Sequence, residues 1–545
     1  MVTAGRPAWN LADLLEAVAG RVPDAPAVVD RDRSIVPWRE VDRRADQIAA
    51  ALLTGGLARQ ATVGVFMLNS SAFLEAYYGS FKAGLVPVNV NYRYGPAETK
   101  YLLDDSGAAA VLYHARFRDT LGAVRSLEPE RRRLWIEVPD GTPGAVPDWA
   151  EDYTAVVAGD APRADPARRH DDDILLLYTG GTTGLPKGVV WRQAELFEVL
   201  VGAGNPFRGI PVPESIDQLV AAIRTPGPVD MAACPYMHAT GLFNQFLTMM
   251  AGGTSVVVPA TSFDPETLFD TASRERVTLM VIVGDAMARP LAEALRDQPG
   301  RWDLSALRTI VSSGATFSRT VKELLFEHLP DIAILDAFGS SEASGVGATV
   351  SRRGAIPDTA DFTLGANTRL LDDDGRLLPH GTEGEGLVAL GGRLPVGYHN
   401  DPAKTAATFR TIDGARYAVP GDRARVDASG RLHLLGRGSS CVNSGGEKIY
   451  PEEVDEVIRR HPAVADAACV GVPDPRFGQA VAAVVQLRPG HTLGLDELRG
   501  HVKGLLAGYK APRHLVTVDT LVRSPAGKLD HRWLADVARA ATATD

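Results

Sequence analysis

The sequence predicts an α/β fold that is divided into more than one domain. At 545 residues the chain is too long for one ordinary hydrophobic core. Strand-like and helix-like stretches alternate along most of the chain, and this alternation is typical of largely parallel sheets covered by helices. From about residue 362 to 436 short strands are separated by Gly and Asp, which indicates a β-rich subdomain.

The spacing of apolar residues predicts the first elements. From Leu11 to Val18 the apolar residues fall at positions i, i+3, i+4 and i+7 of an amphipathic helix, and residues 38–53 repeat this pattern. Two stretches rich in Pro and Gly, 138–147 and 205–228, are expected to be loops. Strands are predicted over 62–67, 109–113, 173–177, 254–259, 277–283 and 307–312.

A small polar segment, Gly438–Ser440, separates the β-rich region from the rest of the chain. We therefore divide the chain into an N-terminal domain of residues 1–438 and a C-terminal domain of residues 439–545. A helix is predicted to begin at Pro451, because proline and two acids occupy its first turn. Further strands are predicted over 369–371, 386–390, 431–435, 467–472 and 481–487.

Composition and charge exclude several classes of protein. The hydrophobic content of 45% and charged content of 23% are those of a globular protein, and the net charge of −10 argues against nucleic-acid binding. Cys234, Cys441 and Cys469 form no CxxC pair, so neither a disulfide framework nor a zinc site is predicted. No signal-peptide pattern or apolar run of about 18 residues is present, so we expect a soluble cytoplasmic protein without a transmembrane segment.

The most informative segment is the glycine- and threonine-rich stretch from Tyr178 to Gly188. Its glycines free the backbone, its threonines add hydroxyl donors, and Lys187 adds a positive charge. Such a loop can turn N–H groups, hydroxyls and an ammonium toward one point, which suits a phosphate. It follows the predicted strand 173–177, and α/β sheets bind ligands at the carboxyl ends of their strands. The segment therefore predicts a site for a nucleotide polyphosphate.

Two other interpretations of this segment are a Walker A loop and a surface turn. A Walker A loop needs Gly, four residues, and then Gly-Lys-Ser or Gly-Lys-Thr. Counting from Gly181, Pro186 occupies the place of the second glycine, and Gly188 follows Lys187 in place of the hydroxyl that binds Mg²⁺. A P-loop NTPase is therefore excluded, and the segments that follow along the chain disfavour a mere surface turn.

Seven downstream segments occur in the order found in one known family. They are Pro235–Gly241, Ser312–Ala315, Phe338–Glu342, Gly421–Asp422, Gly436–Arg437, Ser444–Pro451 and Ser524–Lys528. Together with Thr179–Gly188 they resemble the motifs of the adenylate-forming superfamily, which contains acyl-CoA synthetases, adenylation domains and luciferases. The resemblance covers essentially the whole chain. Around 178–191 and 436–451 it is most similar to bacterial fatty-acyl and sterol-side-chain CoA ligases.

This resemblance implies an ATP-dependent carboxylate–CoA ligase that forms an acyl-adenylate. The N-terminal domain would comprise two parallel-sheet α/β subdomains and a β-rich subdomain. The C-terminal domain would be a small mobile α+β lid that rotates between two half-reactions. The expected ligands are a carboxylic acid, ATP, Mg²⁺ and CoA, and the resemblance leaves a homodimer open.

The resemblance also assigns an ATP site. Thr179 and Lys187 would act on the β- and γ-phosphates, and Glu342 would bind Mg²⁺, with a helix-start carboxylate as the alternative. Phe338 would stack on adenine or else be a core aromatic, and Asp422 would accept the ribose hydroxyl protons. The implied ATP- and AMP-binding residues are Thr179, Gly180, Gly181, Thr182, Thr183, Gly184, Lys187, Ser313, Gly314, Ala315, Asp336, Ala337, Phe338, Gly339, Ser340, Ser341, Asp422, Arg437 and Lys528.

The reacting groups are assigned in the same way. Lys528 would bridge the attacking carboxylate and the α-phosphate, where an ammonium stabilises charge that builds in the transition state. The implied acyl pocket consists of Tyr236, His238, Phe243, Gly314 and Phe317, with a structural role for His238 as an equal alternative. The implied CoA tunnel consists of Ser444, Gly445, Gly446 and Glu447. The pocket segments are mainly apolar, which favours a hydrophobic or aromatic acid.

Two residues depart from the pattern of many relatives. Gly180 stands where serine is common, and Ser440 stands where an aspartate or lysine hinge residue is common. A chain of small residues can still pivot, so a hinge without a salt bridge is expected. Both departures match the fatty-acyl and sterol branch.

Other functions fit the same ATP motifs. A carrier-protein-loading adenylation enzyme, or a diazotase that activates nitrite for an aromatic amine, would change the acceptor or the activated anion. The intact Ser-Gly-Gly-Glu-Lys sequence at 444–448 favours CoA. A nucleotide-sensing protein with a decayed site is disfavoured, because Lys528, Glu342 and Asp422 are all present.

Overall fold

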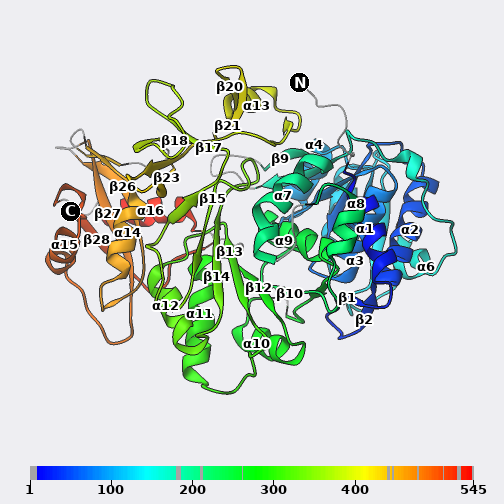
Figure 1. Cartoon of the computed structure of the whole chain (residues 1–545), viewed down its shortest axis with the longest axis horizontal. Helices are drawn as coiled ribbons and strands as arrows, with labels where there is room; N and C mark the ends of the chain where they lie inside the picture. The colour runs from blue at the N-terminus through cyan, green and yellow to red at the C-terminus, as the bar shows by residue number, and fades with distance from the viewer. Residues whose placement is uncertain are drawn as a thin grey trace.

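The computed structural model describes residues 9–179, 186–208, 213–260, 262–437, 442–444, 447–474, 478–506, 508–523 and 529–542. Three sheets organise these residues (Figure 1), and the predicted combination of parallel α/β subdomains, a β-rich region and a small C-terminal domain is confirmed. The predicted domain boundary at 438–440 lies outside the described residues.

The first sheet is largely parallel and ends in an antiparallel hairpin. Its strand order is β19-β9-β8-β4-β3-β5-β6-β7, in which the strands from β8 to β7 run parallel and β9 pairs antiparallel with both β8 and β19. The bounds are β3 (Thr62–Phe66), β4 (Val86–Asn89), β5 (Ala110–His114), β6 (Leu134–Val138), β7 (Glu151–Asp152), β8 (Ile174–Thr179), β9 (Lys187–Arg192) and β19 (Gly397–Tyr398). The β8–β9 hairpin therefore encloses the predicted phosphate loop.

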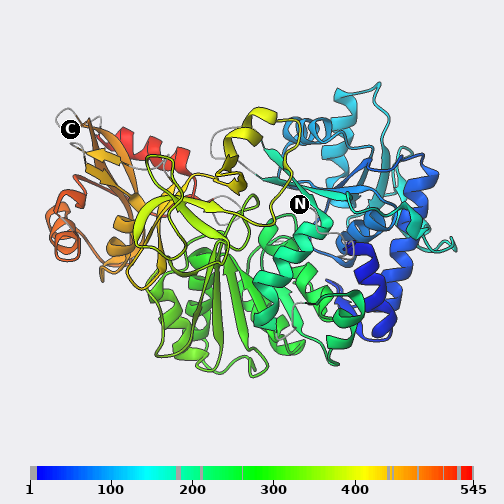
Figure 2. The same cartoon turned by 45° about the horizontal axis from the view of Figure 1, so that its top comes forward.

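The second sheet joins a parallel half to the β-rich region. The parallel strands, with antiparallel β2 at the edge, are β1 (Pro26–Val29), β2 (Ile35–Pro37), β10 (Val229–Ala232), β11 (Thr254–Val256), β12 (Leu279–Ile282), β13 (Thr309–Ser313) and β14 (Ala333–Phe338). The antiparallel strands are β15 (Gly347–Ser351), β16 (Asp361–Leu364), β17 (Thr368–Leu371), β18 (Gly384–Leu390), β20 (Phe409–Ile412), β21 (Ala415–Ala418), β22 (Asp422–Val426) and β23 (Arg431–Arg437). In the view of Figure 2 the β-rich region lies between the first sheet and the C-terminal domain.

Helices cover both parallel sheets. They are α1 (Leu11–Arg21), α2 (Trp38–Thr54), α3 (Ser71–Lys82), α4 (Pro96–Asp105), α5 (Arg118–Leu127), α6 (Tyr153–Val157), α7 (Gln193–Arg208), α8 (Ile216–Ala222), α9 (Ala239–Met250), α10 (Pro265–Arg274), α11 (Gly284–Asp297), α12 (Arg319–His328) and α13 (Pro402–Thr408). The helices predicted from Leu11 and over 38–53 are confirmed as α1 and α2. No described helix is long and apolar enough to cross a membrane.

The prediction of a loop over 205–228 is partly wrong. Helix α7 continues to Arg208, and α8 lies within the segment. Ser215 caps α8 by accepting a hydrogen bond from the Gln218 N–H at 3.2 Å, and Leu219 is buried. The prolines and glycines therefore flank a short helix instead of filling a loop.

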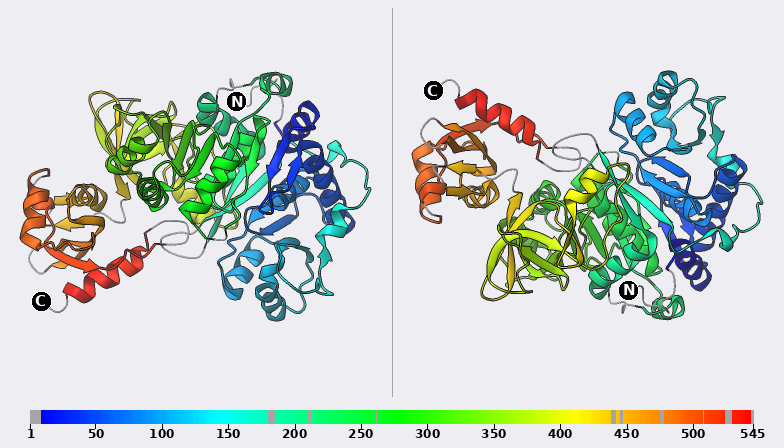
Figure 3. Two further views of the ribbon diagram at one scale, coloured as in Figure 1. Left: turned by 90° about the horizontal axis from the view of Figure 1, so that it is seen from below. Right: turned by 90° about the horizontal axis from the view of Figure 1, so that it is seen from above.

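The C-terminal domain is an antiparallel sheet with one parallel edge strand and helices on both faces. Its elements are β24 (Val442–Ser444), β25 (Glu447–Ile449), α14 (Pro451–Arg459), β26 (Val464–Asp474), β27 (Gly478–Leu487), α15 (Leu495–Lys503), β28 (His514–Val518) and α16 (His531–Thr542). The predicted helix start at Pro451 is confirmed. Apolar residues of α14 and α15 pack on one face, and those of α16 pack on the other. Figure 3 shows this domain at the end of the molecule opposite the first sheet.

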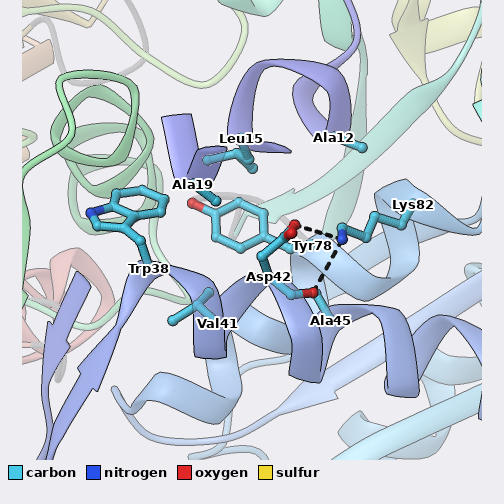
Figure 4. A pocket seen from close by; sticks show the side chains of 9 residues that line it. All are labelled: Ala12, Leu15, Ala19, Trp38, Val41, Asp42, Ala45, Tyr78 and Lys82. Atoms are coloured by element: carbon cyan, nitrogen blue, oxygen red, sulfur yellow. Dashed lines mark hydrogen bonds and ion pairs between the residues drawn. The ribbon is translucent and has the colours of Figure 1, made fainter. Parts of the chain in front are cut away.

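Helices α1, α2 and α3 enclose a buried ion cluster beside a small cavity (Figure 4). The Lys82 ammonium lies 2.6 Å from Asp42, 2.8 Å from Asp46 and 3.3 Å from Glu16. The cavity measures about 10 Å³, which is room for about one water molecule. It therefore cannot hold a nucleotide or an acyl chain, and the cluster joins the three helices.

Candidate active site

The hairpin of β8 and β9 positions the first two predicted site residues. Thr179 and Lys187 face each other as the last register pair of the hairpin. The loop residues between them that were predicted to hold phosphate, Gly180–Gly184, lie outside the described residues. The Lys187 ammonium forms an ion pair with Asp401, the N-cap residue of α13. This ammonium keeps the pKa of Asp401 below its ordinary value.

The segment predicted to bind metal is tied to the same hairpin. The Trp191 Nε1–H donates to the Ser341 carbonyl at 2.9 Å, and the Tyr398 hydroxyl donates to Glu342 Oε1 at 2.7 Å. Tyr398 belongs to β19, which pairs with β9. Sequence reasoning missed Tyr398, since it lies outside the segments that carry the resemblance, and it gave no role to Trp191, although Trp191 lies at the end of the stretch 178–191.

Glu342 offers oxygen chemistry that suits Mg²⁺. Among the described residues no group of three or more His, Cys, Asp or Glu side chains could hold a metal ion. A magnesium ion commonly takes one or two carboxylates and completes its shell with phosphate and water oxygens. A single carboxylate held beside the β8–β9 hairpin fits that donor set.

The carboxyl ends of β13 and β14 bring the predicted adenine segments together. Ser313 and Ala337 are register partners, so the segments 313–315 and 336–339 leave the sheet side by side. Gly314 has a φ of +88°, a conformation that side-chain-bearing residues rarely adopt. A Cβ at Gly314 would lie 3.5 Å from Thr240 Oγ1, so the start of α9 reaches this edge.

The Asn89 side chain links the first sheet to the segment that follows β10 of the second sheet. Asn89, at the end of β4, accepts the Tyr178 N–H at 2.6 Å and donates to the carbonyls of Tyr178 and Met237. Its side chain is buried. The strand before the phosphate loop and the predicted acyl-pocket segment are therefore fixed to each other by one amide, a role that sequence reasoning did not assign.

The predicted aromatic residues are largely packed into the protein. The Phe338 ring is stacked on Phe362 with centroids 5.3 Å apart. The Tyr236 hydroxyl hydrogen-bonds Ser255 Oγ at 2.7 Å, and its side chain is fully buried. Phe243 and Phe317 are also buried. His238 and Gly314, which are also predicted to border the acid, are more exposed.

Asp336 has a partner that the sequence did not suggest. Its carboxylate is buried and lies 2.9 Å from the Lys322 ammonium. Burial raises the pKa of Asp336, the Lys322 ammonium opposes this shift, and the Asp285 carboxylate adds to it. The Asp336 carboxylate is therefore engaged in an ion pair within the protein.

The predicted ribose and CoA residues are only partly within the described chain. Asp422 begins β22 as the register partner of Arg437 in β23. Ser444 is buried in β24 and pairs with Glu447. Lys528, Gly445 and Gly446 lie outside the described residues, so the roles predicted for them remain predictions.

Comparison with known proteins identifies the family. A family model described as AMP-binding enzyme matches residues 15–398, and one described as AMP-binding enzyme C-terminal domain matches 453–528. The chain belongs to the AMP-binding enzymes. It is an AMP-forming ligase of this family, which confirms the resemblance to the adenylate-forming superfamily.

Individual relatives match this ligase along nearly its whole length. A medium/long-chain-fatty-acid–CoA/3-oxocholest-4-en-26-oate–CoA ligase of Mycobacterium tuberculosis is 40% identical over 541 residues, covering 99% of this chain and 98% of the relative. A 3-oxocholest-4-en-26-oate–CoA ligase of Rhodococcus rhodochrous is 38% identical, covering 97% and 96%. The crystal structure of the anthranilate CoA ligase AuaEII in complex with anthranoyl-AMP has the same fold, with a TM-score of 0.84, 23% identity, and coverage of 98% and 99%.

Proposed function

We propose that this ligase joins a hydrophobic carboxylic acid to CoA through an acyl-adenylate, with ATP as Mg²⁺·ATP. The observation that carries the proposal is the convergence of the phosphate-loop hairpin, Glu342 and the adenine segments at the carboxyl ends of two parallel sheets. Ligands of α/β proteins bind at such edges. The match to named CoA ligases along nearly the entire chain supports the same activity.

In the first half-reaction a carboxylate oxygen of the acid attacks the α-phosphorus of ATP. The bond from that phosphorus to the bridging oxygen breaks, and pyrophosphate leaves with the electron pair. The Lys187 ammonium would leave Asp401 and bind phosphate oxygens of ATP, and the Thr179 hydroxyl would bind the same phosphates. Tyr398 holds Glu342 where it would bind Mg²⁺, which offsets phosphate charge when bound. Lys528 would contact the attacking carboxylate and the α-phosphate.

In the second half-reaction the CoA sulfur attacks the acyl carbonyl. The thiol loses its proton, the carbon–oxygen bond to phosphate breaks, and AMP leaves. Ser444–Glu447 would line the path of pantetheine, with the C-terminal domain as the moving lid. This assignment rests on the family resemblance and on the position of β24 and β25 at the start of that domain.

The acid is proposed to be hydrophobic for two reasons. The segment from Pro235 into α9 buries Tyr236, Met237, Leu242 and Phe243, so its surroundings are apolar. The relatives carry names that specify fatty acids and a steroid acid. We further propose a cytoplasmic location, and a homodimer stays a prediction that light scattering of the purified protein can check.

Mass spectrometry of reaction products tests the proposal. The purified protein is incubated with Mg²⁺·ATP and pooled fatty, steroid and aromatic acids, with and without CoA, and in parallel with nitrite and aromatic amines. Acyl-CoA that appears together with an equal amount of AMP supports the proposal and identifies the acid. AMP that forms only with nitrite and an amine, independently of CoA, would replace it with the diazotase alternative.

A further inference from the structure

A buried ion pair includes Asp336, the first residue of the predicted adenine segment 336–339. Lys322 of α12 is 1% exposed and Asp336 of β14 is 4% exposed, and their Nζ and Oδ2 atoms are 2.9 Å apart. Among the residues that the structure describes, Lys322 and Asp336 form an ion pair with each other and with no other side chain. Asp336 is followed in the chain by Ala337, Phe338 and Gly339, which are predicted to bind the nucleotide.

The same lysine also contacts Phe317, a residue of the predicted acyl pocket. Its ammonium lies 5.0 Å from the centroid of the Phe317 ring, within the range of a cation–π interaction. Phe317 is one of the residues predicted to border the acid. Lys322 therefore contacts one residue at the predicted adenine segment and one at the predicted acyl pocket.

The helix that carries Lys322 is itself held in place. The N-cap residue of α12, Ser318, donates its N–H to Asp285 Oδ1 at 2.8 Å, and the Lys322 N–H donates to the Ser318 carbonyl at 3.1 Å. Asp285 lies in the first turn of α11. Contacts between α11 and α12 therefore hold the helix that carries the buried Lys322 side chain.

A buried ion pair is a poor way to stabilise a core. Two charges lose their hydration, and well-packed apolar side chains often stabilise a protein equally well. What the pair supplies is a defined geometry, because a buried carboxylate without its ammonium must move or take up a proton. Asp336 lies near the carboxyl end of β14, directly before the residues that are predicted to bind the nucleotide.

We propose that Lys322 is a positioning residue for ATP: it holds Asp336 and thereby fixes the backbone of residues 337–339 against the adenine. The proposal rests on the proposed function, since it needs ATP at this edge. Lys322 does not touch the reacting atoms. The charged groups that face Asp336 are Lys322 from α12 and Asp285 from α11.

Calorimetric binding of Mg²⁺·ATP to the full chain, without acid, tests the proposal. Lys322→Met leaves an unpaired buried carboxylate, and the double variant Lys322→Met/Asp336→Asn leaves no buried charge at the pair. Lys322→Arg keeps the charge. Lys503→Met, at an exposed lysine of α15, is the matched control.

The double variant is expected to bind ATP about tenfold more weakly than wild type at both about pH 6 and about pH 8.5. Lys322→Met, in which the buried Asp336 carboxyl has lost its ammonium, is expected to bind ATP at least as weakly as the double variant. Lys322→Arg is expected to stay within about threefold of wild type, and Lys503→Met to be unchanged.

A double variant that binds ATP within about twofold of wild type would overturn the proposal, and so would a Lys322→Met variant that binds ATP as tightly as wild type. If Lys322→Met does not fold, the double variant alone decides, because it carries no unpaired charge. A wild-type protein that binds no ATP would instead refute the proposed function. The two failures are therefore distinguishable.

Discussion

Tyr398 fixes the carboxylate of Glu342, and replacing Tyr398 by Phe tests what that hydrogen bond contributes. The variant removes one hydrogen bond of 2.7 Å to a charged acceptor and keeps the ring that packs near Phe409. We expect the rate of pyrophosphate release to fall about tenfold or more, with a higher Mg²⁺ requirement. Tyr509→Phe, at an exposed tyrosine, is the control. An unchanged Mg²⁺ dependence would show that Tyr398 does not position the metal ligand.

Asp401 and ATP compete for the same ammonium in our interpretation of the site. Both side chains of the Lys187–Asp401 pair are partly exposed, so the pair itself contributes little to stability. Asp401→Asn keeps a side-chain oxygen that can cap α13 but removes the charge. We expect the KM for ATP to fall about twofold to fivefold, measured by coupled pyrophosphate release. A higher KM would mean that Asp401 orients Lys187 and does not compete with phosphate.

At the scale of elements, α14 carries a carboxyl that makes the C-terminal domain sensitive to pH. Burial raises the pKa of Asp455 from its ordinary value of 3.8 to about 7, and the carboxylate accepts the Cys469 N–H at 2.5 Å. A carboxyl with a raised pKa binds more protons in the folded state. Its contribution therefore destabilises the fold as pH rises from about 4 to about 7 and is constant above that.

Asp455→Asn removes this titration and keeps an acceptor for the Cys469 N–H. We expect the Tm of the variant, relative to wild type, to rise by a few degrees between about pH 4.5 and about pH 8, measured by calorimetry of the full chain. Asp496→Asn, on the exposed face of α15, serves as the control. A Tm difference that is constant with pH would contradict the assignment to Asp455.

Periodicity predicts an element when the element is long and its apolar face is regular. Helices α1 and α2 meet both conditions, and their predicted ranges are confirmed. Helix α8 has only seven residues between Pro- and Gly-rich segments, so periodicity had too little sequence to detect it. Periodicity cannot predict the side-chain contacts of the candidate site, because these join residues that are distant in the sequence. Tyr398 and Glu342 are 56 residues apart, and only the pairing of β19 with β9 brings them together.

At the scale of the whole molecule, polar bonds join described residues of the C-terminal domain to the rest of the chain. Thr359 Oγ1 donates to Glu456 Oε1 at 2.8 Å, and the Tyr450 hydroxyl donates to Glu385 Oε1 at 3.1 Å. Glu385 also pairs with Arg423 at 3.3 Å. Contacts of this kind resemble those of transient interfaces, across which domains move. They favour the prediction that this domain is a lid with more than one orientation.

Separating the two half-reactions tests that prediction. Lys528→Ala should slow adenylation about 100-fold or more, because it removes charge stabilisation at the α-phosphate, while CoA attack on supplied acyl-adenylate should largely survive. Thr359→Val with Tyr450→Phe should weaken the orientation seen here and change one half-reaction more than the other. Each rate is measured by rapid quench with chromatographic separation of acyl-adenylate and acyl-CoA. Equal losses in both half-reactions for both variants would mean that one lid orientation serves the entire cycle.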